Sequence, residues 1–273
     1  MSTTTTTPAR TVTGSGLSLG RVIRSEWIKL RSLRSTIWSY AIVIVVSLGL
    51  SFVLASALSN SDFGPIIDTP ERMLIQASTF GTTFGVLVVA VLGVLVISGE
   101  YSTGMARSTF TAVPKRLPAL AAKAIVLFVT TFVVGLIATL GSAAVALVIL
   151  NSNGLEPAIS GEFVSSILLA CLYLSLVSVF ALAFGTILRS SAGGIAAALG
   201  ILLLLPTILM VVASVTQAQW AIDLVPFMLT TAGESMMLPS EGGLETWQST
   251  LTVALWATVP LVGGALLLKS RDA

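Results

Sequence analysis

The sequence predicts an all-α membrane protein with six transmembrane helices and both termini in the cytoplasm. Three observations lead to this fold class. Of the 273 residues, 55% are apolar and 10% are charged, whereas a soluble domain carries roughly 25% charged residues. The apolar residues gather into six long runs, and nearly all basic residues lie on one side of those runs. An excess of Lys and Arg marks the cytoplasmic side of a membrane protein.

Each apolar run is long enough to cross a bilayer, because about 18 apolar residues suffice for a spanning helix. The first run gives about 33 Å of helix at about 1.5 Å per residue, against a hydrocarbon core of about 30 Å. The third run exceeds this length, so we expect it to tilt or to project from the bilayer. A tight hairpin at residues 189–191 separates the fourth run from the fifth. The predicted spans are residues 37–58, 74–98, 119–150, 163–188, 192–215 and 249–268.

The charges between the runs predict the orientation. With the N-terminus inside, 13 of the 14 basic residues fall in inner segments, and nine of the 12 acidic residues fall in outer segments. Only Arg72 is a basic residue on the outer side. The formal net charge of +2 hides this separation, so it gives no reason to expect a nucleic-acid partner.

The residues before the first span divide into a tail and an amphipathic segment. Residues 1–18 are rich in Thr, Ser and Gly without a hydrophobic period, so we expect a disordered cytoplasmic tail. Residues 19–36 place apolar side chains on one side of a helix and cations on the other, as in helices that lie in the membrane interface. Trp27 would sit at headgroup depth, with Lys29 and Arg31 directed toward anionic lipid. Glu26 falls inside the apolar sector, so either a cation pairs with it or this edge faces protein.

Several classes of chemistry are excluded by composition. The chain has no His and one Cys, Cys171, which removes histidine-centred metal sites and Ser-His-Asp or Cys-His catalysis. No charged residue lies deep within a span, so a proton relay is not available. No phosphate-binding loop of the G-x-x-x-x-G-K-[ST] type occurs. We therefore predict no catalytic residues, no metal and no cofactor in this chain, and a separate subunit as the energy source. Sodium coupling through backbone carbonyls stays open.

Two inner segments carry a distinctive set of residues. Gly-Glu-Tyr occupies positions 99–101 at the end of the second run, and Pro-Lys-Arg occupies positions 114–116 before Lys123. Residues 25–32, before the first span, read SEWIKLRS. Together with Gly104 and Arg107, these segments resemble the membrane permeases of type-2 ABC exporters, particularly the short actinobacterial kind. The resemblance covers nearly the whole chain and says nothing about the cargo.

The resemblance implies roles for both inner segments. From the residues alone, 103–112 can form a short helix that ends before Pro114. The resemblance implies that this is the coupling helix, docked on an ATP-binding subunit beside an elbow helix at 19–36. Glu100 has two interpretations: it caps this helix or pairs with Arg107, or it links the loop to the elbow or to the ATPase. The inner cations also serve topology. The implied coupling residues are Glu100, Tyr101, Gly104, Arg107, Phe110, Pro114, Lys115 and Arg116, and the elbow residues are Glu26, Trp27, Lys29 and Arg31.

The segment between the fifth and sixth runs, residues 216–248, is too long for a simple turn. Its apolar pieces predict two short re-entrant helices, and an acidic outer loop is the alternative. The resemblance implies an extracellular gate here, formed by Trp220, Pro226, Phe227, Met236 and Met237. Within the spans, Gly81 and Gly85 form a G-x-x-x-G pair that permits close helix packing within or between subunits. Pro206 is expected to kink the fifth span and to act as a hinge.

These patterns predict the membrane-spanning permease subunit of an ATP-binding-cassette exporter in a bacterial plasma membrane. The cargo would be a small amphipathic or hydrophobic compound, such as a drug, antibiotic, peptide or lipid-like molecule. The expected partners are two copies of an ATPase subunit that binds ATP and Mg²⁺, a second permease subunit in a homodimer, and membrane lipid. Two alternatives remain: a gradient-driven carrier or channel, and a membrane anchor or sensor that does not transport.

Overall fold

The computed structural model describes residues 18–59, 69–104, 116–239 and 243–270, and within these ranges all regular structure is helical. Most of the two predicted tails lies outside the described residues. The elements in chain order are α1 (Leu19–Ser32), α2 (Arg34–Ser59), α3 (Pro70–Ser102), α5 (Arg116–Ser152), α6 (Gly161–Leu188), α7 (Ser191–Leu199), η2 (Gly200–Leu204), α8 (Leu205–Thr216), α9 (Gln219–Leu224), η3 (Val225–Phe227), α10 (Leu229–Met237) and α11 (Thr246–Ser270).

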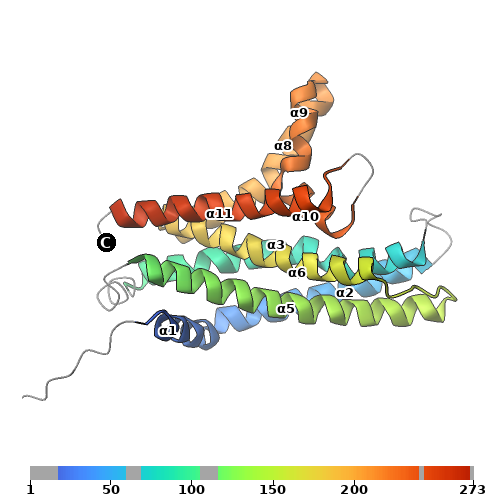
Figure 1. Cartoon of the computed structure of the whole chain (residues 1–273), viewed down its shortest axis with the longest axis horizontal. Coiled ribbons are helices and arrows are strands. Elements are labelled where there is room, and N and C mark those ends of the chain that lie inside the picture. Colours follow the sequence, from blue (N-terminus) through green and yellow to red (C-terminus); the bar gives the residue numbers. More distant parts are fainter. Residues whose placement is uncertain (1–17, 60–68, 105–115, 240–242, 271–273) are drawn as a thin grey trace, which may run out of the picture.

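Six helical stretches are long and apolar enough to cross a membrane, which confirms the six predicted runs. Five of them, α2, α3, α5, α6 and α11, lie side by side as an elongated bundle (Figure 1). The sixth is the continuous stretch Ser191–Thr216. α5 has 37 residues and is therefore about 56 Å long at about 1.5 Å per residue, as the length of its run predicted. Many large apolar side chains face outward, for example Trp38, Phe52, Val148 and Val259, as helices in contact with lipid require.

The centre of the bundle is the contact between α3 and α6, the two most buried spans. Close approach depends on small residues. A Cβ added at Gly93 would overlap the carbonyl oxygen of Ser178 on α6, and a Cβ at Gly81 would overlap the Cα of Ser47 on α2. Gly85 faces Leu174 and Val43 at ordinary contact distance. The G-x-x-x-G pair is thus used within one subunit, against α2 and α6.

The fourth and fifth spans meet in the predicted hairpin. α6 ends at Leu188, and Arg189 has a φ of 50° that reverses the chain. The Ser190 side chain then accepts a hydrogen bond from the Gly193 N–H, which caps α7.

The fifth span is interrupted before Pro206. The helix widens into a π-helix over η2, and the Leu205 N–H donates to the carbonyl of Gly200. A proline in a helix interior removes a hydrogen bond and crowds the preceding turn, so a π-helix here gives the ring room. Beyond Pro206, α8 leaves the bundle. The predicted kink is therefore present, and it ends the packing of this span on its neighbours.

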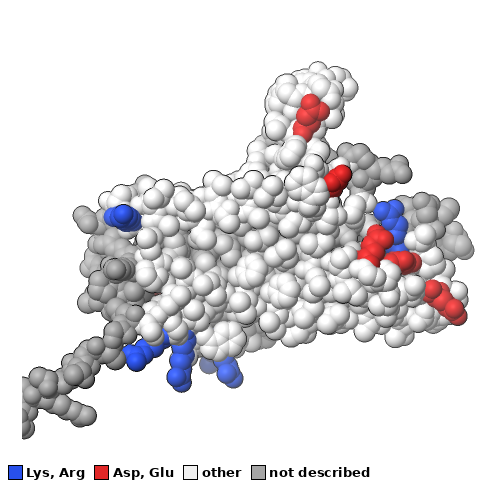
Figure 2. Space-filling model, in the orientation of Figure 1, with Lys and Arg blue, Asp and Glu red and all other residues white. Residues whose placement is uncertain are grey.

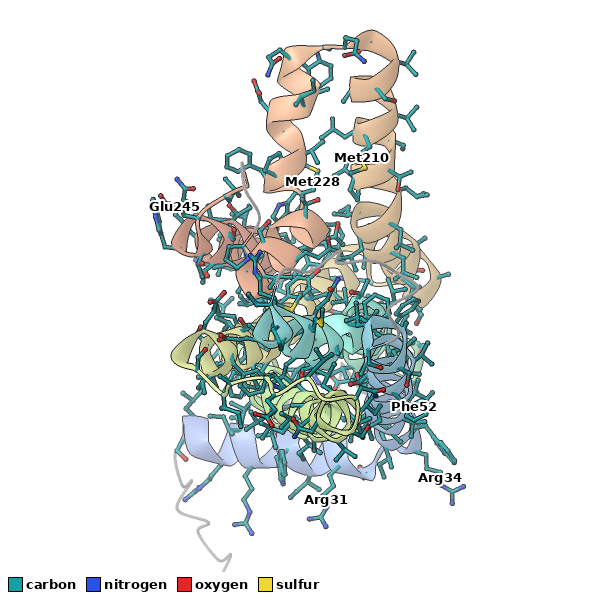
Figure 3. All side chains as sticks on the ribbon, turned by 90° about the vertical axis from the view of Figure 1, so that its right-hand side faces the viewer. Arg31, Arg34, Phe52, Met210, Met228 and Glu245 are labelled. Carbon is teal, nitrogen blue, oxygen red and sulfur yellow. The ribbon has the colours of Figure 1, made fainter. Side chains whose placement is uncertain are left out.

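α8 and α9 form an arm that stands clear of the bundle (Figure 1; Figure 3). Met210 lies on α8, and Met228 lies near the base of the arm (Figure 3). α10 then returns to the bundle and packs against α6 and α11. The segment predicted as two re-entrant pieces is helical over most of its described residues, and its two helices lie in very different surroundings.

Charged side chains separate along the bundle. Figure 2 shows basic residues mainly at one end, and acidic residues at the other end and on the arm. α1 and the last turn of α11, with Lys269, form the basic end. Glu71 and Glu162, in the first turns of α3 and α6, belong to the acidic end. This separation is the one that the predicted orientation requires.

Candidate functional site

α1 turns toward the bundle a face that contains a carboxylate. Val22, Glu26 and Leu30 follow at intervals of four residues and are buried, and α1 packs against α5. Arg31 points away from the bundle (Figure 3), and Trp27 is 45% exposed. The edge of α1 that carries Glu26 therefore faces protein, which confirms one of the two possibilities that the sequence left open.

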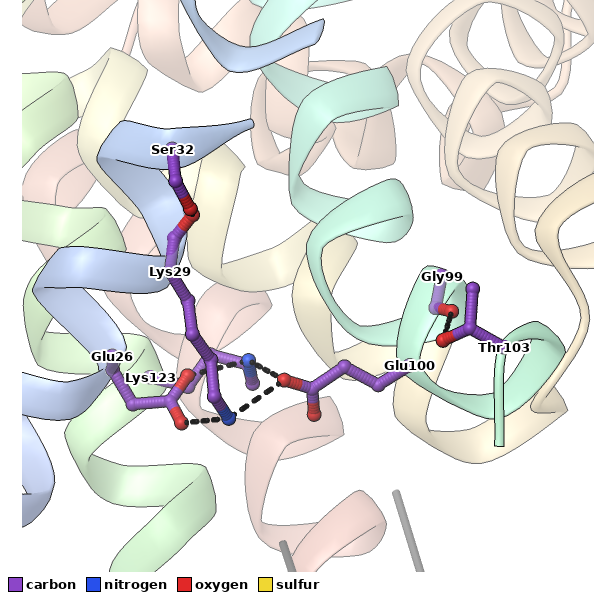
Figure 4. A network of polar contacts seen from close by, with 7 residues as sticks. All are labelled: Glu26, Lys29, Ser32, Gly99, Glu100, Thr103 and Lys123. Atoms are coloured by element: carbon purple, nitrogen blue, oxygen red, sulfur yellow. Dashed lines mark hydrogen bonds and ion pairs between the residues drawn. The ribbon is translucent and has the colours of Figure 1, made fainter. Parts of the chain in front are cut away.

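The other possibility is confirmed as well, because two lysines bind Glu26. Lys123 Nζ lies 2.6 Å from Glu26 Oε2 and 3.0 Å from Glu100 Oε1. Lys29 Nζ lies 2.7 Å from Glu26 Oε1 and 3.0 Å from Glu100 Oε1. The four side chains thus alternate in sign around a closed ring of four ion pairs (Figure 4). We call Glu26, Lys29, Glu100 and Lys123 the ionic ring.

The ionic ring is largely removed from water. The Glu26 and Lys123 side chains are 4% and 6% exposed, and those of Glu100 and Lys29 are 11% and 28% exposed. Charges so deeply buried are costly unless each is paired and hydrogen-bonded. Each lysine here donates to both carboxylates. Removing one member would therefore leave an uncompensated buried charge.

The titration of the two ring residues on α1 reflects this pairing. Burial raises the pKa of the Glu26 carboxyl, but the ammonium groups of Lys123 and Lys29 outweigh it and hold that pKa below its ordinary value. Burial lowers the pKa of Lys29, but its hydrogen bond to Glu26 and the charge of Glu100 outweigh it and raise the pKa above its ordinary value. Both groups therefore stay charged through the physiological pH range.

The ring joins three helices at the place where the chain leaves α3. Glu100 stands near the end of α3 and Lys123 near the start of α5, so they lie on the two helices that the predicted coupling segment connects. Glu26 and Lys29 belong to α1. The four ion pairs thus join α1 to the helices on both sides of that segment. Of the two interpretations of Glu100, the link to the N-terminal helix is confirmed.

The other predicted coupling residues fall partly outside the described part of the chain. Arg107, Phe110, Pro114 and Lys115 lie there, and Arg116 begins α5. The Tyr101 ring lies 5.4 Å from the guanidinium carbon of Arg189, so it also connects α3 to the end of α6. Gly104 has a φ of +73°, a conformation that favours glycine.

The comparison with protein families bears directly on this region. The model of a family described as ABC-2 family transporter protein matches residues 22–201, about two thirds of the chain. The chain belongs to the ABC-2 transporter family. A comparison with curated proteins finds no match. The matched range includes all four residues of the ionic ring and ends within η2, so the arm of this ABC-2 chain lies beyond it.

The predicted gate residues of the ABC-2 chain separate into two groups. Met236 and Met237 are buried in the bundle, and the Thr82 hydroxyl lies 3.3 Å from the Met237 sulfur. Trp220 lies on the arm and Phe227 ends η3 at its base, and both side chains are exposed. The Phe227 carbonyl accepts a hydrogen bond from the Trp256 indole N–H at 2.9 Å, which fixes the base of the arm to α11. Pro226 is the middle residue of η3. The predicted gate is therefore not a single cluster.

Sequence reasoning missed Lys123 as a site residue. It was named within the inner motif and near the inner end of the third span but was given no role, and its partner Glu26 is 97 positions away. The Tyr40 hydroxyl, which lies 2.9 Å from Thr131 Oγ1 between α2 and α5, was missed too. Several other buried hydroxyls within the spans donate to carbonyls of their own helices, for example those of Thr79, Thr82, Ser175 and Ser178, so these donors are not free for cargo.

Proposed function

We propose that this ABC-2 chain forms the membrane pathway of an exporter whose energy comes from a separate ATPase subunit. Members of the ABC-2 family are membrane components of transport systems. In this proposal two ATPase subunits bind ATP and Mg²⁺ at the basic end of the bundle, which faces the cytoplasm of a bacterial plasma membrane. The cargo is a small amphipathic or hydrophobic compound.

The ionic ring is the observation that carries this proposal. A soluble ATPase subunit can move transmembrane helices that it does not contact only if rigid contacts within the permease transmit the displacement. The ring binds α1 to the ends of α3 and α5 with four ion pairs of 2.6–3.0 Å. Closure of the ATPase subunits would push residues 103–118, and the ring would carry that push into α1 and the bundle.

We further propose that the arm packs against a second copy of the chain. Ile208, Val211 and Val215 on α8 are each more than half exposed. The arm also carries Asp223, which accepts a hydrogen bond from Gln219 at 2.9 Å. An acidic side chain is costly in contact with lipid, so protein is the better cover for an arm that extends sideways from the bundle. A two-fold symmetric dimer, the commonest form of homo-oligomer, would cover the arm in this way.

Counting copies in single liposomes tests the second copy. With one fluorophore per chain, the wild type should bleach in two steps. Val211→Trp, which enlarges an exposed side chain of the arm, should shift most liposomes to one step. Phe52→Trp on the outward face of α2 is the matched control and should leave two steps. A wild type that bleaches in one step, or an arm variant that stays dimeric, would contradict the proposed contact.

Purification from its native cell tests the main proposal. A tagged chain should elute with an ATP-hydrolysing subunit in equal amount, and vesicles with that complex should move cargo only with ATP. Flux that persists in ATP-depleted vesicles and follows an ion gradient would favour a gradient-driven carrier. Elution without any ATP-binding protein, and no gain of ATPase activity from an added cassette subunit, would refute the proposal.

A further inference from the structure

A cavity of about 430 Å³ lies beside the ionic ring, between α1, α2, α3 and α5. Its volume is within the range of about 300–1,000 Å³ of small-molecule sites. All four ring residues line it. Apolar side chains, among them Leu33, Leu92 and Val96, and several hydroxyl-bearing side chains line the rest. The cavity therefore combines charged groups with hydroxyls and apolar walls.

Thr36 supplies an unsatisfied hydroxyl to this cavity. Thr36 is 4% exposed, and its Oγ1 has no hydrogen-bond partner among the described residues. Other buried threonines in the bundle, such as Thr139 and Thr186, bond to carbonyls of their own helices. Buried polar groups are nearly always hydrogen-bonded. A hydroxyl that lines a cavity without a partner indicates a group that binds there.

The ionic ring also offers an acceptor to the cavity. Both lysines bond to Oε1 of Glu100, and no described residue donates to its Oε2 (Figure 4). The ring holds two carboxylates and two ammonium groups, so its formal charges cancel. The ring therefore has no net charge that would repel an ammonium group, whether that group belongs to a zwitterion or to a simple amine. The ligand needs a hydrogen-bond donor for Glu100 and an aliphatic part for the apolar walls.

We propose that this cavity binds an amphiphile with an aliphatic chain and an ammonium headgroup that donates hydrogen bonds. Such a molecule would place its donors at Glu100 Oε2 and Thr36 Oγ1 and its chain along Leu92 and Val96. Two sources share this chemistry: a membrane lipid with an ethanolamine headgroup, and a soluble alkylamine. Bound there, the amphiphile braces α1 against α3 beside the ring. The inference needs no transport, so binding tests it independently of the proposed function.

Native mass spectrometry of the delipidated chain in detergent tests the site. The probes are phosphatidylethanolamine and phosphatidylcholine with identical acyl chains, because the choline headgroup is zwitterionic but has no N–H donor. We expect one ethanolamine lipid per chain, bound about tenfold more tightly than the choline lipid, since a hydrogen bond to a charged group contributes about that factor. Dodecylamine that displaces the lipid shows that both sources reach the cavity. Dodecylamine that binds while neither lipid does identifies the soluble source.

Two variants locate the binding. Gly99 lines the cavity, and a Cβ added there meets no atom within 4 Å, so Gly99→Leu adds an apolar side chain at the cavity wall and should lower affinity. Thr36→Val removes the hydroxyl and should lower affinity about tenfold. Thr258→Val is the matched control, because the exposed Thr258 hydroxyl bonds to Ala254 on α11. It should leave binding unchanged.

A melting curve separates a ligand site from a packing defect. Without ligand, Thr36→Val should melt at a higher temperature than the wild type, because it removes an unsatisfied buried hydroxyl. With ligand, its gain in melting temperature should be smaller than that of the wild type. No binding of either probe class to the wild type would overturn the inference. Binding that is insensitive to both Thr36→Val and Gly99→Leu would also overturn it.

Discussion

Glu26 is the residue whose surroundings decide what α1 does. It occupies an otherwise apolar face of α1, and it is buried against Lys123 at 2.6 Å. A carboxylate in this position destabilises the fold unless it is paired. Its pairing binds α1 to α5 in one geometry, because an ion pair in a low dielectric depends steeply on distance.

Loss of Lys123 should therefore destabilise the protein strongly. Lys123→Met should lower the free energy of unfolding by about 3–5 kcal/mol, because Glu26 and Glu100 would share one cation in a buried site. Denaturant titration of the purified chain in detergent measures this. Combining Lys123→Met with Glu26→Gln should cost less than the single change. Lys269→Met, on the exposed last turn of α11, is the control. Equal and small losses of unfolding free energy for Lys123→Met and Lys269→Met would contradict a buried ionic network.

The ring should also limit the pH range over which α1 stays docked. The folded pKa of Glu26 is below its ordinary 4.5, so its contribution is complete above 4.5 and is lost as the pH falls through the folded value. The folded pKa of Lys29 is above its ordinary 10.5, so its contribution is complete below 10.5 and is lost as the pH rises through the folded value.

A fluorophore on Arg24→Cys, an exposed position of α1, can report this docking. Its emission should stay constant between pH 4.5 and pH 10.5 and change outside this window. Glu26→Gln should remove the acid transition alone. A transition near neutral pH would show that other groups control the docking of α1.

Single-residue reasoning identified Glu26, Lys29 and Glu100 as site residues but not Lys123, the second lysine that both carboxylates share. Glu26 stood out because it interrupts an amphipathic pattern, and such a conflict is visible within one helix. Lys123 interrupts no pattern, since a lysine near the inner end of a span is ordinary. Its role depends on contacts between residues 97 positions apart. A periodicity within one helix contains no information about such contacts.

Among the helices, α3 depends on small residues for its contacts with α2 and α6. Gly81 could be recognised in the sequence as part of a G-x-x-x-G pair. Its partner helix could not, because the motif serves contacts within and between subunits alike. The contact is with Ser47 of α2.

Substitution of Gly81 should separate α2 from α3. Gly81→Ala should lower the free energy of unfolding by about 1–3 kcal/mol, because the new methyl group overlaps backbone that cannot move easily. Gly263→Ala is the matched control on α11, where a Cβ meets nothing within 4 Å. It should stabilise the helix by up to about 1 kcal/mol. Thermal unfolding of both variants in the same detergent gives the comparison. Stabilisation by Gly81→Ala would refute the close contact.

The position of the arm is the feature of the helices that the sequence did not predict. Six apolar runs and the kink at Pro206 were readable from composition and from the chemistry of proline. The direction in which α8 leaves the bundle was not. It depends on how η2 and α10 pack against their neighbours, which hydropathy alone does not encode.

The whole molecule is organised by its two oppositely charged ends. The basic end holds α1, the end of α3 and the start of α5, which the ionic ring joins, while the acidic end lies near the start of α3 and of α6. Figure 2 shows the separation of basic and acidic side chains. The chain belongs to the ABC-2 transporter family, and the proposed function places the ATPase subunits at the basic end. In the proposed function, a push at the basic end is transmitted along α3 and α5, the two long helices that the ring joins, toward the far side of the membrane.

A distance measurement on the complete complex tests this transmission most directly. Spin labels on Ser214→Cys, an exposed position of the arm, would report the separation of the two arms in the complex with its ATPase subunits. A non-hydrolysable ATP analogue with Mg²⁺ should change that separation in the wild type. In Lys123→Met, bound analogue should leave it unchanged. An equal change in both proteins, or no change in the wild type, would contradict the account.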